Sequence, residues 1–198
     1  MHKSTFFMLA MLTIAAGCSS EQDSSTHDST IVSTPAVNEV PDEDLLIIPG
    51  VSAGKIKIDE NAAPLYELFG KPDAGDAAMQ KAVAIWYDDH DPAAYAKSIY
   101  SVRDTGDNPI ARVRQIRVTS PEYKTKTGIG VNSSLTEIQG EFTVKKVPDY
   151  PASAAKEALF DSSSGIAFEI DTNMRCRAVL IHPAGEELKT TSLPLREN

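Results

Sequence analysis

Alternation of apolar and polar residues is the feature that most constrains how this chain can fold. It is clearest in Gly165–Asp171, where Ile166, Phe168 and Ile170 point to one side of an extended chain. Similar alternation runs through residues 96–104, 113–120 and 176–183. A period of two is typical of strands, and its regularity predicts an antiparallel sheet with one covered face and one solvated face.

Two short helices are predicted between these strands. In residues 59–72, Asn61 can cap a helix, Pro64 is tolerated in its first turn and Gly70 can end it. Leu65, Leu68 and Phe69 have the spacing of one helical face. The second helix follows a cap at Ser133 or Ser134 and presents Leu135 and Ile138.

The segment 75–89 is ambiguous, because its start favours a helical turn whereas Val83–Tyr87 favours a strand. Residues 54–72 and 128–144 share one pattern: a Gly-bounded extended pair, a polar cap, a short helix and then strands. The sequence therefore predicts an α+β domain with two helix-then-strands repeats. These repeats would form one antiparallel sheet with the short helices packed on one face.

Several stretches carry a resemblance to a known group: IIPGVSAGKIKI, LYELFGKPD, IRVTSPEYKTKTGIGVNSSLTEI, GIAFEID and VLIH. They resemble small bacterial lipoproteins of unknown function and, more distantly, the β-lactamase-inhibitory-protein-like domains. The accessory lipoprotein of the outer-membrane β-barrel assembly machine belongs to that broader group. The resemblance covers most of residues 47–182 and implies a helix-plus-sheet repeat and a function in binding proteins. No contact residue of the group maps onto this chain.

The N-terminus has the pattern of an export signal. The apolar run Phe6–Ala16 has 11 residues, whereas a membrane-spanning helix needs about 20. Ala15-Ala16-Gly17-Cys18 resembles the lipobox of bacterial lipoproteins, with Ala15 where that family usually has Leu. The resemblance implies cleavage before Cys18 and acylation of its thiol and amine. The resemblance also implies that Ser19 after the cysteine, in place of Asp, favours the outer membrane, on its periplasmic or surface side. The alternative to a lipoprotein is an ordinary signal peptide that ends near a cysteine.

Negative charge is concentrated in residues 18–44, and the rest of the chain is close to neutral. Residues 18–44 hold seven acidic residues and no Lys or Arg, and their Ser- and Thr-rich composition predicts a disordered tether. The expected organisation is therefore a signal peptide over 1–17, a tether over 18–44 and one domain over 45–198. That domain carries a net charge of only about −3, so nucleic-acid binding is not expected.

Few residues suggest chemistry. Asp73 and Asp76 flank a Gly-bearing turn and form a candidate binding loop, although helix capping explains them as well. Asp89, His90 and Asp91 are candidate metal ligands, with a polar loop before a proline as the alternative. The Thr-, Lys- and Gly-rich stretch 119–130 is an ordinary connection or an anion site.

Cysteine content bears on both the core and the chemistry. With Cys18 lipidated, Cys176 has no disulfide partner in the chain, and its apolar neighbours predict a buried structural thiol. No cofactor is expected, because no nucleotide-, metal- or nucleophile-type motif is present.

The function expected from the sequence is a non-enzymatic protein-binding or accessory module of the cell envelope. The membrane would hold the protein through the lipid on Cys18, an envelope protein would be its partner, and the solvated sheet face would be the contact surface. One alternative is a small-ligand or carbohydrate-binding lipoprotein. Another is an envelope hydrolase that uses Asp73 with Asp76, or Asp89 with His90.

Overall fold

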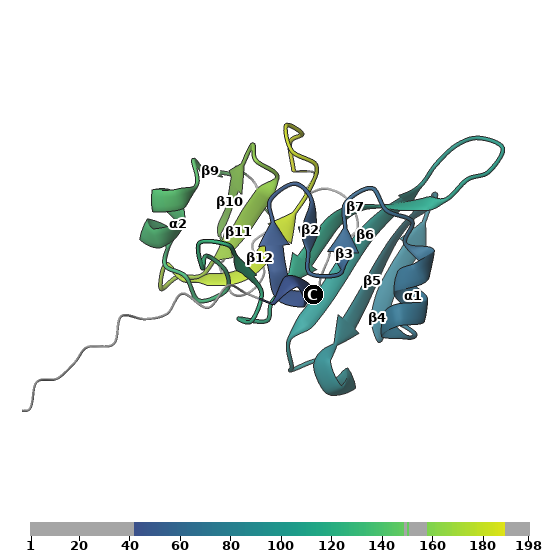
Figure 1. Ribbon diagram of the computed structural model, residues 1–198, viewed down its shortest axis with the longest axis horizontal. Coiled ribbons are helices and arrows are strands. Elements are labelled where there is room, and N and C mark those ends of the chain that lie inside the picture. Colours follow the sequence, from purple (N-terminus) through teal and green to yellow (C-terminus); the bar gives the residue numbers. More distant parts are fainter. Residues whose placement is uncertain (1–41, 149, 151–157, 189–198) are drawn as a thin grey trace, which may run out of the picture. The chain divides into compact units, whose positions relative to one another are not determined.

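Twelve strands, two α-helices and two 3-10 helices form the part of the protein that the computed structural model describes, residues 42–148, 150 and 158–188 (Figure 1). These residues belong to one unit that spans Asn38–Asn198. The expected signal peptide, the lipidation site at Cys18 and most of the expected tether lie outside the described residues. The last tether residues, Glu43 and Asp44, are part of the 3-10 helix η1 (Glu43–Leu45).

The larger sheet has eight strands in the order β4-β5-β6-β7-β12-β11-β10-β9, and every neighbouring pair is antiparallel. Its strands are β4 (Ala74–Ala78), β5 (Lys81–Tyr87), β6 (Ala96–Arg103), β7 (Ala111–Val118), β9 (Lys145–Lys146), β10 (Ala158–Ser162), β11 (Ile166–Ile170) and β12 (Cys176–Ile181). The four stretches of alternation are therefore confirmed as β6, β7, β11 and β12. In Figure 1 the first four strands and the last four form two groups that meet at β7 and β12.

A smaller sheet has the order β3-β2-β1-β8. Its strands are β1 (Leu46–Ile48), β2 (Ser52–Ala53), β3 (Ile56–Lys57) and β8 (Lys124–Thr125). β1 pairs with β8 in parallel, although the two strands are far apart in the sequence. The protein thus has two sheets where the sequence predicted one, because short polar strands such as β8 carry no periodic pattern that would reveal their pairing.

Both predicted helices are present, as α1 (Ala63–Phe69) and α2 (Leu135–Glu141). The N-cap of α1 is Ala62, without a side-chain cap, in place of the predicted Asn61. Asn61 Oδ1 still accepts a hydrogen bond from the Ala63 N–H at 3.1 Å, and Gly70 ends α1 with a φ of 78°. Ser134 and Glu137 form a capping box at the start of α2. The predicted apolar face of α1 is only partly right, because Leu68 is 52% exposed. A two-turn helix has room for one buried row, and Leu65 occupies it.

The ambiguous segment is a hairpin of β4 and β5, so the expected helical turn at its start is wrong. Met79 and Gln80 form the tip with φ values of 49° and 66°. Small residues such as those of β4 have no strong local preference, and pairing with the apolar strand β5 decides their conformation.

One face of the larger sheet packs against both helices. Leu65 of α1 and Ile138 of α2 belong to the same buried cluster as Ile99, Val113 and Phe168 of the sheet. Trp86 of β5 contacts the rings of Tyr66 and Phe69, and its indole N–H donates to the Gly70 carbonyl at 2.9 Å. Phe142, at the end of α2, packs on Phe168.

The opposite face is also buried, so the expected solvated face is wrong. A second buried apolar cluster includes Val83, Tyr100, Leu159 and Leu180, and Glu169 beside it is only 1% exposed. Alternation in Gly165–Asp171 correctly separated the two faces of β11, but it could not show that both are covered. An acidic side chain can lie on a buried sheet face when a basic group pairs with it, as Arg117 does with Glu169.

Candidate functional site

A pocket of about 260 Å3 lies beside the start of β6. Five segments bring residues to it: the region of η1, the β2–β3 turn, the end of α1, the β5–β6 connection with β6, and the loop after β7. Its lining residues are Asp44, Leu45, Lys55, Phe69, Asp88, Tyr95, Ala96, Lys97, Ser120, Glu122 and Tyr123. We refer to it as the Tyr123 pocket.

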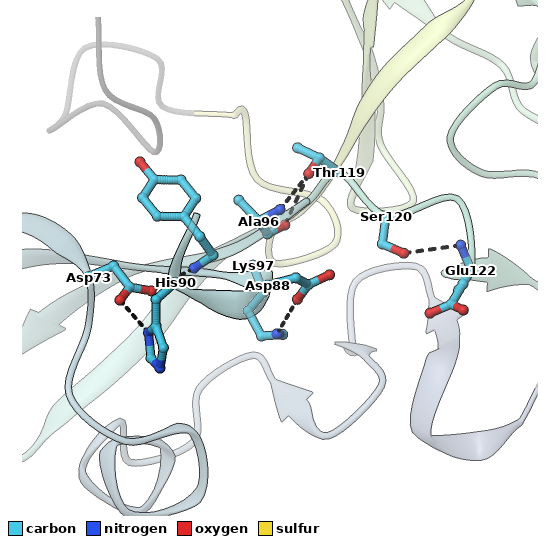
Figure 2. A network of polar contacts seen from close by, with 9 residues as sticks. Asp73, Asp88, His90, Ala96, Lys97, Thr119, Ser120 and Glu122 are labelled. Atoms are coloured by element: carbon cyan, nitrogen blue, oxygen red, sulfur yellow. Dashed lines mark hydrogen bonds and ion pairs between the residues drawn. The ribbon is translucent and has the colours of Figure 1, made fainter. Parts of the chain in front are cut away.

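Hydrogen bonds of the main chain and of Thr119 hold the loop after β7 against β6. The Thr119 N–H donates to the Ala96 carbonyl at 3.0 Å, and the Ala96 N–H donates to Thr119 Oγ1 at 2.7 Å. One step further, the Glu122 N–H donates to Ser120 Oγ at 3.3 Å (Figure 2). This turn places Glu122 and Tyr123 on the side of the loop that lines the pocket.

Two ion pairs lie in the wall of the pocket. Lys55 Nζ is 2.8 Å from Asp44 Oδ2, and Lys97 Nζ is 3.1 Å from Asp88 Oδ1. The Lys97 ammonium also lies 5.6 Å from the centre of the Phe69 ring, a cation–π distance. In each ion pair, the second carboxylate oxygen of the aspartate makes no hydrogen bond or ion pair with a described residue.

Glu122 is the pocket acid that has no basic partner among the described residues. Figure 2 shows its side chain joined to no other drawn residue, whereas Lys97 reaches Asp88. Its side chain is exposed. The described lining therefore carries three carboxylates against two ammonium groups.

Tyr123 is the most unusual residue of the pocket. The residue as a whole is only 8% exposed, but its hydroxyl is not among the buried polar atoms that lack a hydrogen-bond partner, so it reaches the solvent of the pocket. Burial raises the pKa of its phenol, and the nearby charges of Asp88, Glu122 and Asp44 raise it further. Because the same three carboxylates line the pocket, the hydroxyl lies in a region of negative potential.

Of the residues predicted from the sequence, Asp73 and His90 come together. His90 Nδ1 is 2.6 Å from Asp73 Oδ1, and the Tyr87 N–H donates to Asp73 Oδ2 at 2.8 Å (Figure 2). The Tyr87 N–H, followed by the His90 imidazole, holds the pKa of Asp73 below its ordinary value. The imidazole is 76% exposed, so this pair has no enclosed space in which to hold a substrate.

The structure does not combine the other predicted residues into a site. Asp76 lies on β4, where its Oδ1 accepts a hydrogen bond from the neighbouring Ala77 N–H at 2.8 Å. Asp89 and His90 have positive φ values, of 55° and 58°, in the turn around the 3-10 helix η2 (Asp88–His90). Across the described ranges, no three His, Cys, Asp or Glu side chains lie close enough to hold a metal ion.

The Tyr123 pocket is not predicted from the sequence. The stretch 119–130, which contains Glu122 and Tyr123, was interpreted as a connection or an anion site, whereas the pocket beside it is rich in carboxylates. One signal was available: Tyr123 is a large aromatic residue flanked by charged residues in an otherwise polar loop. Its partners lie up to about 80 positions away in the chain and could not be identified without the fold.

Two further features bear on chemistry. A second pocket, of about 630 Å3, lies beside β9 and has Lys145, Asp161 and Glu186 among its lining residues. Cys176 is fully buried, as predicted, and burial raises the pKa of its thiol to about 12. A thiol with so high a pKa stays protonated at neutral pH and is a poor nucleophile.

Neither α-helix within the described ranges has the length or the apolar character required to cross a bilayer. A comparison with protein-family models found no match, and comparisons with curated proteins and with solved structures also found none.

Proposed function

We propose that the protein is a lipoprotein of the bacterial cell envelope whose folded domain binds a protein partner without catalysing a reaction. The lipid on Cys18 holds it in the outer membrane, on the periplasmic or the surface side. The observation that carries the binding role is the open Tyr123 pocket, where residues from five separate segments meet and three aromatic side chains, Phe69, Tyr95 and Tyr123, lie in one lining.

The proposed contact surface is the Tyr123 pocket and its rim, in place of the buried second sheet face. Tyr95 is 50% exposed at this rim, and tyrosine is enriched at protein interfaces. The pocket is smaller than the roughly 300–1,000 Å3 typical of small-molecule sites. Side chains also fill the space between the helices and the sheet, which favours a protein partner over an enclosed small ligand.

The strand order supports the proposed repeat and the distant resemblance. Strands β4 to β7 form one consecutive antiparallel group that follows α1, and β9 to β12 form another that follows α2. The last strand of each group pairs with the last strand of the other. Two helix-then-strands units related in this way are the arrangement that the β-lactamase-inhibitory-protein-like resemblance implies, and that group acts by binding proteins.

The hydrolase alternative receives less support. The His90 imidazole of the Asp73–His90 pair is largely exposed, and Asp76 bonds to its own strand. General acid–base catalysis requires groups within hydrogen-bond reach of a bound substrate. None of these three residues lines either of the two pockets described above.

Anchoring is tested by changing Cys18 to Ser and separating the membranes from the soluble fraction. We expect the parent chain in the membrane fraction with an acylated N-terminal cysteine by mass spectrometry, and the variant in the soluble fraction. Equal membrane association of the two chains, with an unmodified cysteine in the parent, would contradict lipid anchoring.

Partner binding is tested by placing a photo-crosslinking amino acid at Tyr95 in the anchored chain in cells. Met174 is the matched control, because it is similarly exposed (54%) and does not line the pocket. We expect one envelope protein to crosslink at Tyr95 and not at Met174. The same products at both positions, or none at Tyr95, would refute the proposed contact surface.

A further inference from the structure

We infer that the C-terminal segment 189–198 lies across the second face of the larger sheet, where it covers β5 and β6. The second face is the one opposite the helices, and it carries the buried cluster that includes Val83, Tyr100, Leu159 and Leu180. The occupant of this face is thus a part of the same chain, the residues that follow Leu188. The inference goes beyond the proposed function and does not depend on the Tyr123 pocket.

The first support is that the β5–β6 part of this face is buried. Val83 and Ile85 of β5 stand opposite Tyr100 and Ser98 of β6, so the four side chains share one face. Each of the four is at most 5% exposed. Because both helices pack on the other face of the sheet, the burial of these side chains requires a cover on the second face.

The described residues do not supply that cover. Within the described ranges, three apolar residues join this cluster from outside the eight strands: Val147, Tyr150 and Leu188. The Val147 N–H donates to the Leu159 carbonyl of β10, and the Tyr150 hydroxyl donates to Glu169 of β11. Both residues therefore lie in the other half of the sheet from β5. One leucine, Leu188, is too small to cover four side chains on two strands.

Ser98 is a second, independent support. Its Oγ is buried and has no hydrogen-bond partner among the described residues. It lies between Ile85 and Arg117 of the neighbouring strands. Buried polar groups in proteins are nearly always paired, and an extended segment over the sheet carries main-chain N–H and C=O groups that no ladder uses. Such a segment supplies a partner for Ser98, whereas a purely apolar cover leaves it unpaired.

The path of the chain points to residues 189–198. Leu188 belongs to the cluster and is only 8% exposed, so the chain leaves the described residues on this face. Three strand spacings, roughly 14 Å, separate β12 from β5, whereas ten extended residues reach up to about 33 Å. The compact unit that contains the sheet runs to Asn198 and thus includes this segment.

The composition of the segment also fits the face. Leu193 and Leu195 are two positions apart, so they point to the same side of an extended chain. Pro194 between them lacks an N–H, which suits a segment that lies over a sheet without joining a ladder. Arg196 and Glu197 follow, and charged residues of this kind favour the solvated rim of a buried surface.

Two other segments outside the described ranges fit less well. Residues 151–157 (PASAAKE) connect Tyr150 to Ala158 of β10, so they start and end in the half of the sheet that lacks β5, and they carry no large apolar side chain. The residues before Asp42 lead into η1, and Leu45 of η1 packs on the cluster of the first face. The C-terminal segment is therefore the best candidate for the cover.

Photo-crosslinking in the full chain, purified in detergent micelles, tests the position of the segment. The probe is benzoylphenylalanine at Leu193, and the same probe at Val37 is the control. We expect crosslinks within one chain from Leu193 to the tryptic peptides that carry β5 and β6, residues 82–97 and 98–103, and none from Val37. Mixing isotope-labelled and unlabelled chains separates crosslinks within a chain from crosslinks between copies.

The other outcomes overturn the inference. Crosslinks to these peptides from Val37 alone would assign the face to the N-terminal segment, and crosslinks between copies alone would assign it to a second molecule. The absence of any crosslink from Leu193 to either peptide would show that the C-terminal segment lies elsewhere.

Substitution of both leucines tests the burial. Leu193→Ser with Leu195→Ser should lower the Tm by at least about 5 °C and shift the methyl NMR signals of Val83 and Ile85, but not those of the first-face cluster. Leu68→Ser, the same change at a residue that is 52% exposed, is the control and should lower the Tm by less than about 2 °C. Equal losses, or unchanged Val83 and Ile85 signals, would refute the inference. If the double variant does not fold, the crosslinks still decide the question, because they leave Leu195 and the rest of the cover in place.

Discussion

The ion pair between Arg117 and Glu169 offers the sharpest prediction about stability. Arg117 on β7 reaches across β12 to Glu169 on β11, with Nε 3.1 Å from Oε1 and Nη2 2.8 Å from Oε2. The Tyr150 hydroxyl donates to the same carboxylate at 2.6 Å. The two charged side chains are only 9% and 1% exposed, so water cannot replace either partner when the other is removed.

The change Arg117→Leu removes the guanidinium that pairs with the buried Glu169 carboxylate. Breaking a buried ion pair from one side costs about 3–5 kcal/mol of the free energy of unfolding. For a domain of this size, 1 kcal/mol lowers the Tm by about 2–4 °C, so the predicted loss is about 6–20 °C. A loss of about 3–5 kcal/mol is a large share of the roughly 5–15 kcal/mol that stabilises a typical domain.

The double variant Arg117→Leu with Glu169→Gln removes both charges and keeps an oxygen that can accept from Tyr150. It should recover about 2 kcal/mol of the loss, because a neutral amide is less costly to bury than a carboxylate. Urea unfolding followed by fluorescence reports both values, since the protein has one tryptophan, Trp86, and it is buried.

Arg177→Leu is the matched control for this cycle. Arg177 lies on β12 but is exposed, so its loss should change the free energy of unfolding by less than about 0.5 kcal/mol. If Arg117→Leu costs no more than the control, or if the double variant is no more stable than the single one, the buried charge is not the source of the effect.

Three further predictions concern single positions. Gly165 and Gly128 have nearly equal φ values (86° and 87°), but a Cβ at Gly165 would lie 2.4 Å from a carbonyl oxygen and one at Gly128 would meet nothing. Gly165→Ala should therefore destabilise the domain well beyond the roughly 1–2 kcal/mol of left-handed strain shared by Gly128→Ala; equal losses in urea unfolding would contradict the steric argument. Because burial raises the pKa of Cys176 to about 12 from an ordinary value of 9.0, the unfolded thiol ionises first and stability should fall as pH rises from 9 to 12. By pH 10 the parent should lose about 1 kcal/mol more than Cys176→Ala, and parallel urea curves would refute this. Asp76→Ala removes a charge from the exposed edge strand β4 and frees the Ala77 N–H, so light scattering should show increased self-association; an unchanged monomer fraction would contradict a protective role.

The sequence alone identified what is decided within a few residues of the chain. Alternation located β6, β7, β11 and β12, and capping residues located both helices, at Gly70 for the end of α1 and Ser134 for the start of α2. These patterns are reliable because side-chain direction and helix capping depend on near neighbours. The same reasoning failed for β4, where small residues have no strong preference of their own.

The tertiary structure alone decided how many sheets form, which faces are covered and where the pocket lies. Alternation in β11 predicted two faces with different side chains, but only the packing shows that Glu169 is buried against Arg117. Asp73 and His90 were each recognised as polar loop residues, and the hairpin of β4 and β5 brings them into contact. In the Tyr123 pocket, residues from five separate segments meet because strand register and loop packing join distant parts of the chain. Local sequence patterns do not predict such a pocket, because they depend on near neighbours in the chain, whereas the pocket depends on contacts between distant segments.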